Sequence, residues 1–219
     1  MLEKMSEFFE RRLDGYDEHM LNDIESAREF YPFTAKCLPK TPSCKILDLG
    51  CGTGLELEEY FSLNPTAHVT GIDLSAEMLK AMKKKFPDKK LTLLCGSYFS
   101  VPLGEEIYDA AVSVESLHHF TQLEKLALYK KLYGSLKKEG YFILTDYFAP
   151  SEEEETRLRN AFKAQKKEQG IEDGEFYHFD TPLTVRHETE ALLAAGFAVV
   201  EQLGKWGNTY TLRAWVSVR

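Results

Sequence analysis

Three glycines at alternate positions follow an aspartate and could hold a ligand directly against the main chain. The segment Asp48–Gly54 carries Gly50, Gly52 and Gly54 behind an apolar run that begins at Ile46. Without Cβ atoms, these positions can adopt positive φ and let a flat group such as adenosine lie beside the N-terminus of a following helix. A structural turn explains a lone glycine pattern equally well, so the surrounding elements must decide.

The residues around this loop predict a strand before it and a helix after it. Branched apolar residues precede the glycines, and apolar residues return at helical spacing from Leu55. A second strand, 67–75, ends in Asp73, and Ser75 is placed to cap the next helix. A carboxylate at a strand end about 20 residues past such a loop can accept hydrogen bonds from ribose hydroxyls. The pair of features favours a nucleotide-type ligand over a structural turn.

The two segments resemble motif I and the following motif of class I S-adenosylmethionine (SAM)-dependent methyltransferases. Dinucleotide oxidoreductases use Gly-x-Gly-x-x-Gly, whose third glycine is replaced here by Leu55, so the resemblance favours SAM over NAD. It implies methyl transfer from SAM with S-adenosylhomocysteine as product. The residues that it implies for the cofactor are Asp48, Gly50, Cys51, Gly52, Thr53, Gly54, Asp73, Leu74, Ser97, Tyr98, Glu115 and Tyr16.

Two of these assignments depart from the family pattern or lie far from the loop. Family members often place an acidic residue where Ser97 stands, so the adenine contact would fall to the Ser97 hydroxyl and the Tyr98 backbone N–H. By the same resemblance, Tyr16 in the N-terminal segment could approach the methionine end of SAM. We interpret Arg11, which lies nearby in the sequence, as a solvated arginine.

Two histidines follow the fourth predicted strand, 108–115. Glu115, His118 and His119 should lie at the carboxyl edge of a parallel sheet, where open α/β folds keep their ligand crevice. Histidine titrates near neutrality and can take a proton from a hydroxyl or amine nucleophile. We therefore name His118 and His119 as candidate catalytic bases, although either one could instead cap local backbone groups.

Length and composition are those of a globular protein. The 219 residues fit one domain, 1–219, and the charged N-terminal residues lack the apolar core of a signal peptide. No apolar run approaches the ~20 residues of a membrane span, so we expect a cytoplasmic protein with no membrane segment. The net charge of −8 argues against a large footprint on nucleic acid, although a local basic patch stays open. The cysteines have no metal-ligand spacing, and no metal is implied.

The predicted fold is a seven-stranded, mostly parallel, Rossmann-like α/β/α sandwich. Its C-terminal strands, 197–203 and 209–218, would form an antiparallel hairpin, and residues 138–140 a turn before the fifth strand. Two helices within 1–40 and the stretch 151–181 would form a helical cap over the cofactor. The aromatic residues that could converge there are Tyr16, Tyr147, Phe176, Tyr177, Phe179 and Trp206.

These observations favour a small-molecule acceptor, because aromatic groups bury apolar or cationic ligands but do not neutralise phosphates. Three alternatives stay open: an enzyme resembling tRNA base methyltransferases, a catalytically silent SAM-binding module and, less favoured, a nicotinamide oxidoreductase. The acceptor atom and the oligomeric state leave no signature in the sequence.

Overall fold

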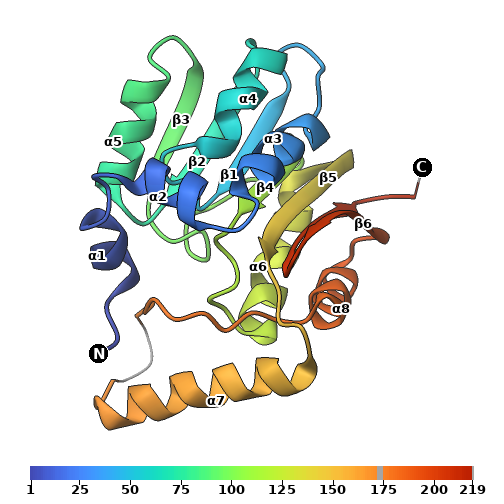
Figure 1. Cartoon of the computed structure of the whole chain (residues 1–219). Helices are drawn as coiled ribbons and strands as arrows, with labels where there is room; N and C mark the ends of the chain where they lie inside the picture. The colour runs from blue at the N-terminus through green and yellow to red at the C-terminus, as the bar shows by residue number, and fades with distance from the viewer. Residues whose placement is uncertain (172–174, 219) are drawn as a thin grey trace.

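The computed structural model describes residues 1–171 and 175–218. Within these ranges, seven strands form one sheet in the order β3-β2-β1-β4-β5-β7-β6 (Figure 1). They are β1 (Lys45–Leu49), β2 (His68–Asp73), β3 (Lys90–Cys95), β4 (Tyr108–Val114), β5 (Leu136–Tyr147), β6 (Val199–Trp206) and β7 (Thr209–Trp215). The pairs from β3 to β5 are parallel, whereas β7 is antiparallel to both β5 and β6. The predicted sheet and its C-terminal hairpin are confirmed.

Helices bury both faces of this sheet. On one face, α3 (Ala27–Cys37), α4 (Leu55–Leu63) and α5 (Ala76–Lys85) share an apolar cluster with Ile46 and Val112 of the central strands. On the other face, α6 (Gln122–Ser135) and α8 (Val185–Ala195) share a second cluster with Leu47 and Phe142. Alternate residues of the central strands therefore point into two separate cores, which is the three-layer arrangement that the sequence predicts.

Most predicted helix ends are confirmed by side-chain caps. Ser75 and Thr184 accept hydrogen bonds from the third residue of the helix that follows, and Thr121 forms a full capping box with Glu124. Ser151 likewise caps α7 (Glu152–Glu168) through its hydroxyl. The side chain of Glu154 pairs with Arg157 at 2.6 Å between Oε1 and Nη2.

Two local expectations were wrong. The N-terminal stretch forms three helices, α1 (Met5–Glu10), α2 (Tyr16–Asp23) and α3, because the chain breaks at Ser26, whose φ is 60°, as well as at Gly15. Residues 138–140 are part of β5 rather than a turn, and the pairing of β5 with β4 shifts register between Tyr108 and Ala110. A short irregularity in the ladder thus replaces the expected break.

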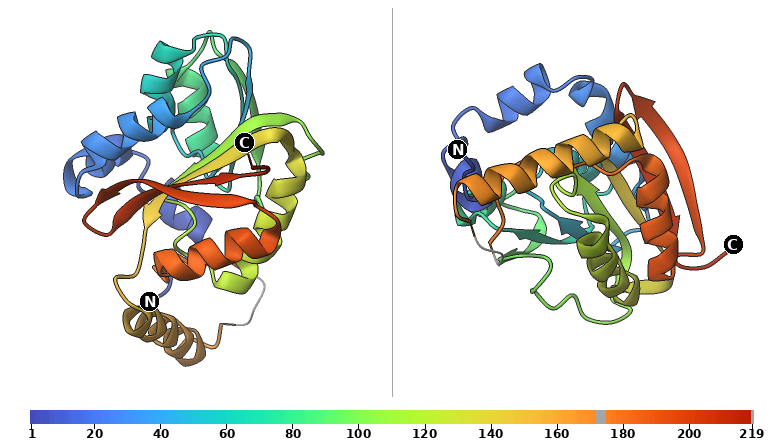
Figure 2. Two further views of the ribbon diagram at one scale, coloured as in Figure 1. Left: turned by 90° about the vertical axis from the view of Figure 1, so that its right-hand side faces the viewer. Right: turned by 90° about the horizontal axis from the view of Figure 1, so that it is seen from below.

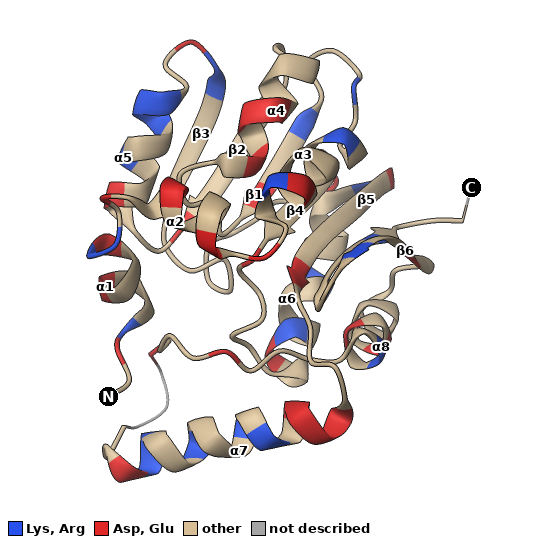
Figure 3. Ribbon diagram, in the orientation of Figure 1, with Lys and Arg blue, Asp and Glu red and all other residues tan. Residues whose placement is uncertain are grey.

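The two stretches predicted to form a cap meet at the carboxyl edge of the sheet. Lys4 and Tyr177 form an isolated antiparallel bridge, and the Met5 N–H donates to the Phe176 carbonyl oxygen at 2.9 Å. Helix α7 lies across the same edge (Figures 1 and 2). Its acidic first turn and basic last turn complement the helix dipole (Figure 3). Residues 172–174, which the predicted cap includes, lie outside the described residues.

No helix among the described residues is both long and apolar enough to cross a bilayer.

Candidate active site

The glycine loop between β1 and α4 has the conformation that its composition predicts. Gly50, Gly52 and Gly54 have φ values of 74°, 47° and 75°, which favour glycine. A Cβ on Gly50 would lie 2.0 Å from the Ser116 Oγ, so the end of β4 packs directly against the loop. Because the three glycines have no side chains, the main chain of this loop is not covered by side chains of its own.

Asp73, at the end of β2, is held by the same loop. Its Oδ2 accepts a hydrogen bond from the Gly52 N–H at 2.9 Å, and its Oδ1 accepts from the Ser75 N–H at 2.8 Å. Burial raises the pKa of Asp73, although these backbone donors oppose that effect. The carboxylate lines a narrow crevice of about 40 Å³ together with Gly50 and Gly52.

Two further carboxyl groups are buried beneath the loop without full hydrogen bonding. Among the described residues, Asp48 Oδ2 and Glu56 Oε1 have no partner, and both side chains are at most 5% exposed. Burial and then the neighbouring Glu56 carboxylate raise the pKa of Asp48 well above its usual value. A buried acceptor without a donor is costly. The ammonium group of a SAM methionine would supply one, so these residues fit that cofactor.

Helix α2 places Tyr16 over the crevice. The Tyr16 ring lies within 4.0 Å of the position of a Cβ on Gly52, and burial followed by the Asp73 charge raises the pKa of Tyr16. Asp17 anchors the helix, because it accepts hydrogen bonds from Thr53 Oγ1 at 2.5 Å and Lys85 Nζ at 2.6 Å. The N-terminal segment therefore covers the glycine loop, where the family resemblance expects Tyr16.

The remaining cofactor candidates surround the crevice in structural roles. Ser97 Oγ accepts from the Phe99 N–H at 3.2 Å, and the Tyr98 hydroxyl donates to the Ser116 carbonyl oxygen at 3.2 Å. Cys51 is buried against Gly71, and the Leu74 carbonyl oxygen accepts from the Cys95 thiol at 3.7 Å. None of these contacts tests the predicted adenine interactions.

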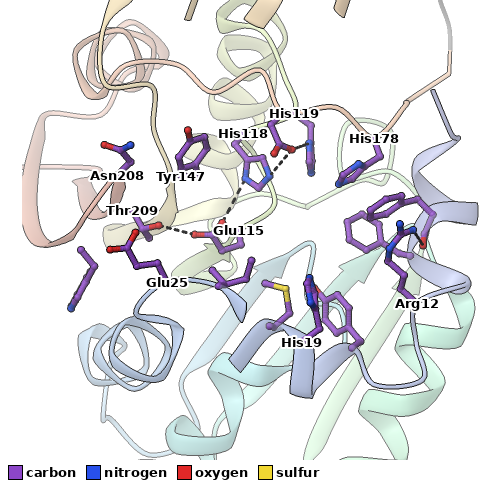
Figure 4. A pocket seen from close by; sticks show the side chains of 17 residues that line it. Arg12, His19, Glu25, Glu115, His118, His119, Tyr147, His178, Asn208 and Thr209 are labelled. Carbon is purple, nitrogen blue, oxygen red and sulfur yellow. Dashed lines mark hydrogen bonds and ion pairs between the residues drawn. The ribbon is translucent and has the colours of Figure 1, made fainter. Parts of the chain in front are cut away.

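A larger cavity of about 450 Å³ adjoins the crevice (Figure 4). The crevice and the cavity share Phe9, Tyr16, Glu115 and His119 as lining residues. Figure 4 shows that side chains reach the cavity both from the N-terminal segment, where Arg12 follows α1 and His19 lies in α2, and from the edge of the sheet. The other lining residues are Phe8, Phe9, Met20, Ile24, Glu25, His118, Tyr147, His178, Asp180, Trp206, Asn208 and Thr209.

His118 is fixed by a buried carboxylate at the end of β5. Its Nδ1 lies 2.5 Å from Asp146 Oδ1, and Asp146 Oδ2 accepts from the Leu117 N–H at 2.8 Å. Burial opposes a charge on His118, but Asp146 and then Asp180 outweigh it and hold the pKa of His118 well above its usual value. The Nε2 atom is left facing Asp180 Oδ1 at 3.5 Å.

His119 has the opposite electrostatic environment. Burial and then the neighbouring His118 charge lower its pKa. Its Nδ1 lies 3.2 Å from the Phe179 carbonyl oxygen and 3.3 Å from Asp180 Oδ1. The pKa values of the two adjacent histidines thus shift in opposite directions, because only His118 contacts the buried Asp146.

Glu115 joins the crevice to the histidines under backbone strain. It has a φ of 49°, and its Oε1 accepts from the Thr209 hydroxyl at 3.4 Å, while Oε2 lies 3.9 Å from His118 Nδ1. Burial, and then the Asp146 charge, raise its pKa to about 8. A non-glycine residue with positive φ at a ligand crevice is typical of functional sites.

Sequence reasoning missed part of this cavity. Asp180 and His178 come from the stretch after α7, and Phe8, Phe9 and Arg12 from the stretch around α1. The alternation of His178 and Asp180 in an aromatic segment was the available signal. Arg12 rather than Arg11 lines the cavity; Arg11 is exposed and pairs with Glu3, as its interpretation as a surface arginine requires.

The predicted convergence of six aromatic residues is only half right. Tyr16, Tyr147 and Trp206 line the cavity. Phe176 and Tyr177 line a separate cavity of about 430 Å³ under α7. Phe179 stacks on Phe162 of α7 with ring centroids 5.2 Å apart. The path of the chain between α7 and α8 alternates between the two cavities, which composition alone does not reveal.

Comparison with known proteins gives this geometry a family context. Residues 47–144 match the family model of the methyltransferase domain. The chain is 25% identical to a carboxy-S-adenosyl-L-methionine synthase of Campylobacter fetus, over 98% of this chain and 96% of that relative. It is 28% identical to a malonyl-[acyl-carrier protein] O-methyltransferase of Bacillus cytotoxicus over 74% of this chain, and it spans about half, 55%, of that relative's length. The crystal structure of a SAM-dependent methyltransferase from Mesorhizobium loti matches the fold with a TM-score of 0.61 at 21% identity, over 84% of this chain and 96% of that one.

The structural match agrees with the fold described above. These similarities support a class I SAM-dependent methyltransferase that uses SAM as its cofactor. The resemblance inferred from the two motifs is thereby confirmed.

Proposed function

We propose that the protein transfers the methyl group of SAM to a small-molecule acceptor held in the 450 Å³ cavity. The observation that carries this proposal is the continuity of the two spaces: Tyr16, Glu115 and His119 line both the crevice beside the glycine loop and the cavity. An acceptor in the cavity would therefore face the cofactor at the end of β4. The N-terminal helices and residues 178–180 would exclude water from the pair.

The chain's own residues would position the cofactor. The main chain of the glycine loop and Asp73 would hold the nucleoside, with Asp73 on the ribose, and the carboxyl groups of Asp48 and Glu56 would receive the methionine ammonium group. When bound, SAM supplies an electrophilic methyl group on a positively charged sulfur. Because the crevice measures about 40 Å³, we propose that α1 and α2 move outward to admit SAM and then close over it.

The histidine pair would activate the acceptor. His118 and His119 are at most 8% exposed and lie beside the crevice, and Asp146 fixes the ring of His118. A neutral imidazole can act as the general base that the sequence predicts, with a contribution of roughly 10²–10⁴ to the rate. The lowered pKa of His119 favours it over His118 for this role, whereas the raised pKa of His118 favours its charged form. Methyl transfer to an ionisable hydroxyl or to an amine requires such a group, since the nucleophile must lose a proton.

The histidine role has a direct test. His118→Gln and His119→Gln should lower turnover by roughly 10²–10⁴, while calorimetry should show SAM affinity nearly unchanged. His68→Gln, a histidine of β2 that does not line the cavity, is the matched control and should keep full rate. Full activity of both site variants between pH 6 and 8 would show that neither histidine activates the acceptor.

Turnover itself is tested by the products formed from SAM. Purified protein incubated with SAM and fractionated cell extract should release S-adenosylhomocysteine in one fraction, and mass spectrometry should find an acceptor heavier by one methyl group. The relative that matches over the whole length is named a carboxy-SAM synthase, so the same spectra should be searched for carboxylated SAM. Carboxylated SAM without a methylated acceptor would replace our proposal, and SAM binding with neither product would indicate a silent module.

A further inference from the structure

We propose that His118, His119 and Asp180 form a binding site for a divalent transition-metal ion at the floor of the acceptor cavity. This inference rests on the proposed function only for its consequence: histidines that bind a metal ion would activate the acceptor through that ion, in place of the general-base role proposed above. The site itself is argued from positions and distances. It was not foreseen from the sequence, where no metal is implied, because two ligands are adjacent and the third follows α7.

The three side chains converge on one point. His118 Nε2 lies 3.5 Å from Asp180 Oδ1, His119 Nδ1 lies 3.3 Å from the same oxygen, and all three ligand atoms lie within 4.8 Å of one another. Four-coordinate metal bonds of about 2.0–2.1 Å place neighbouring ligand atoms about 3.3–3.4 Å apart. The His119–Asp180 distance of 3.3 Å matches that spacing, and the His118–Asp180 distance of 3.5 Å is slightly longer. Without a metal ion, both contacts are long for N–H···O hydrogen bonds, whose usual range is 2.7–3.2 Å.

Asp146 holds the ring of His118 in the way that a metal-binding histidine requires. His118 directs its Nδ1 to the buried Asp146 at 2.5 Å, which leaves Nε2 as the atom that faces the cavity. A histidine ligand almost always donates its other ring N–H to such a carboxylate, because that bond fixes the tautomer and the ring orientation. Asp146 is in turn hydrogen-bonded by the Leu117 N–H at 2.8 Å. The chain thus supplies an ordered carboxylate–histidine pair behind the first ligand.

His119 has a competing interaction. Its Nδ1 lies 3.2 Å from the Phe179 carbonyl oxygen, which would accept a hydrogen bond from the protonated nitrogen. Metal binding would require the other tautomer, at the expense of that one long bond. A neutral imidazole exchanges its tautomer readily, so the cost is small beside the gain from a metal–nitrogen bond.

The ligand set restricts the kind of ion. Two imidazoles and one carboxylate suit Zn²⁺, Fe²⁺, Co²⁺ or Mn²⁺ and are a poor set for Mg²⁺ or Ca²⁺, which prefer oxygen ligands. Three protein ligands leave at least one position open, and His118, His119 and Asp180 all line the 450 Å³ cavity (Figure 4). An acceptor hydroxyl that binds there would release its proton to solvent more readily, and the resulting oxygen nucleophile would stay beside the cofactor crevice.

Metal binding can be measured without SAM or acceptor. After treatment with a chelator and desalting, the full-length protein should bind one Zn²⁺ per chain by calorimetry. Co²⁺ should produce the visible absorption bands of a low-symmetry nitrogen–oxygen site. Asp180→Asn and His119→Gln should each weaken Zn²⁺ binding at least 100-fold. Asp146→Asn should weaken it 10–100-fold, because Asp146 orients the ring of His118.

A matched control separates the site from general histidine binding. His19→Gln changes a histidine that lines the same cavity but lies 2.7 Å from Asp23, and it should bind Zn²⁺ as the unaltered protein does. Circular dichroism and thermal unfolding of the metal-free variants check that each one folds. Equal Zn²⁺ affinity of folded Asp180→Asn and the unaltered protein would overturn the proposal, as would the absence of stoichiometric binding in the unaltered protein.

The metal-site proposal and the proposed methyl transfer can be refuted independently of each other. Methyl transfer that persists at full rate in the chelator-treated protein would refute the metal's role in activation but leave the methyltransferase intact. Stoichiometric Zn²⁺ binding in a protein that produces no S-adenosylhomocysteine with any fraction would support the site and contradict the proposed reaction.

Discussion

At the scale of single residues, Asp73 carries a prediction for the cofactor. Its carboxylate already holds the Gly52 and Ser75 amides, at 2.9 Å and 2.8 Å, at the crevice that should receive the ribose. Asp73→Ala should weaken SAM binding by about 1.5–3 kcal/mol, which is typical of losing a hydrogen bond to a charged group. Titration calorimetry with SAM and with NAD measures both this loss and the expected preference for SAM.

The controls for Asp73 must distinguish two roles: holding the glycine loop in place and binding the ribose of the cofactor. Asp88→Ala removes an exposed carboxylate after α5 and should leave SAM affinity unchanged. S-adenosylhomocysteine and free methionine serve as a second comparison, because only the former carries a ribose. Equal loss of affinity for both ligands would mean that Asp73 shapes the loop and does not bind the ribose.

At the scale of elements, Glu155 ties the cap helix α7 to α8. It is 3% exposed, and its Oε2 accepts from the Thr184 N–H and lies beside His187 Nδ1, both at 2.8 Å. Burial alone would raise the pKa of Glu155, but the Thr184 amide, His187 and Arg159 together lower it below its usual value. The folded pKa therefore lies below the unfolded one, so this stabilisation is present above about pH 4.3 and is lost as the pH falls through the folded pKa.

Glu155→Gln should consequently destabilise the protein in a pH-dependent way. The free energy of unfolding should fall by about 1–3 kcal/mol at pH 7, and the difference from the unaltered protein should shrink as the pH is lowered below 4. Urea unfolding at several pH values measures it. Glu153→Gln, an exposed residue of the same helical turn, should change stability little at any pH. A difference for Glu155→Gln that stays constant with pH would show that packing, not charge, is responsible.

At the scale of the whole molecule, the net charge and its distribution predict how strongly the protein binds nucleic acid. The net charge is −8, and two of the lysines that could form a basic stripe, Lys85 and Lys137, pair with carboxylates. Lys85 pairs with Asp17 and Glu58, and Lys137 pairs with Asp109 at 2.6 Å. Figure 3 shows acidic residues gathered in the first turn of α7 and basic residues spaced along the helix after it. No large basic surface follows from these contacts.

We therefore expect weak tRNA binding with a shallow salt dependence. A titration of the protein with unmodified tRNA at several salt concentrations should give a slope of log K against log [salt] that is near zero, because few phosphates are neutralised. Tight binding that weakens steeply as salt rises would require the release of several counterions. That result would favour the tRNA alternative over a small-molecule acceptor.

The order of elements was predictable because it depends on near neighbours in the chain. Apolar periodicity located all seven strands, and the caps at Ser75, Thr121 and Thr184 were readable from three or four consecutive residues. The second break in the N-terminal stretch was missed because Ser26 adopts a left-handed conformation without a glycine. Local signals thus determined the elements wherever the residues had their usual preferences.

The meeting of the glycine loop and Asp73 at one crevice was equally predictable, since β1, the loop and Asp73 follow a motif of known spacing. That SAM binds in this crevice stays a prediction. The sequence by itself determined the class of enzyme and its cofactor. Only the tertiary structure decided that His118 meets Asp146, 28 residues away, and that Asp180 reaches both histidines. The physical reason is that those contacts depend on where α7 and its connection cross the edge of the sheet. That path is set by long-range packing against the N-terminal helices, which no local preference encodes.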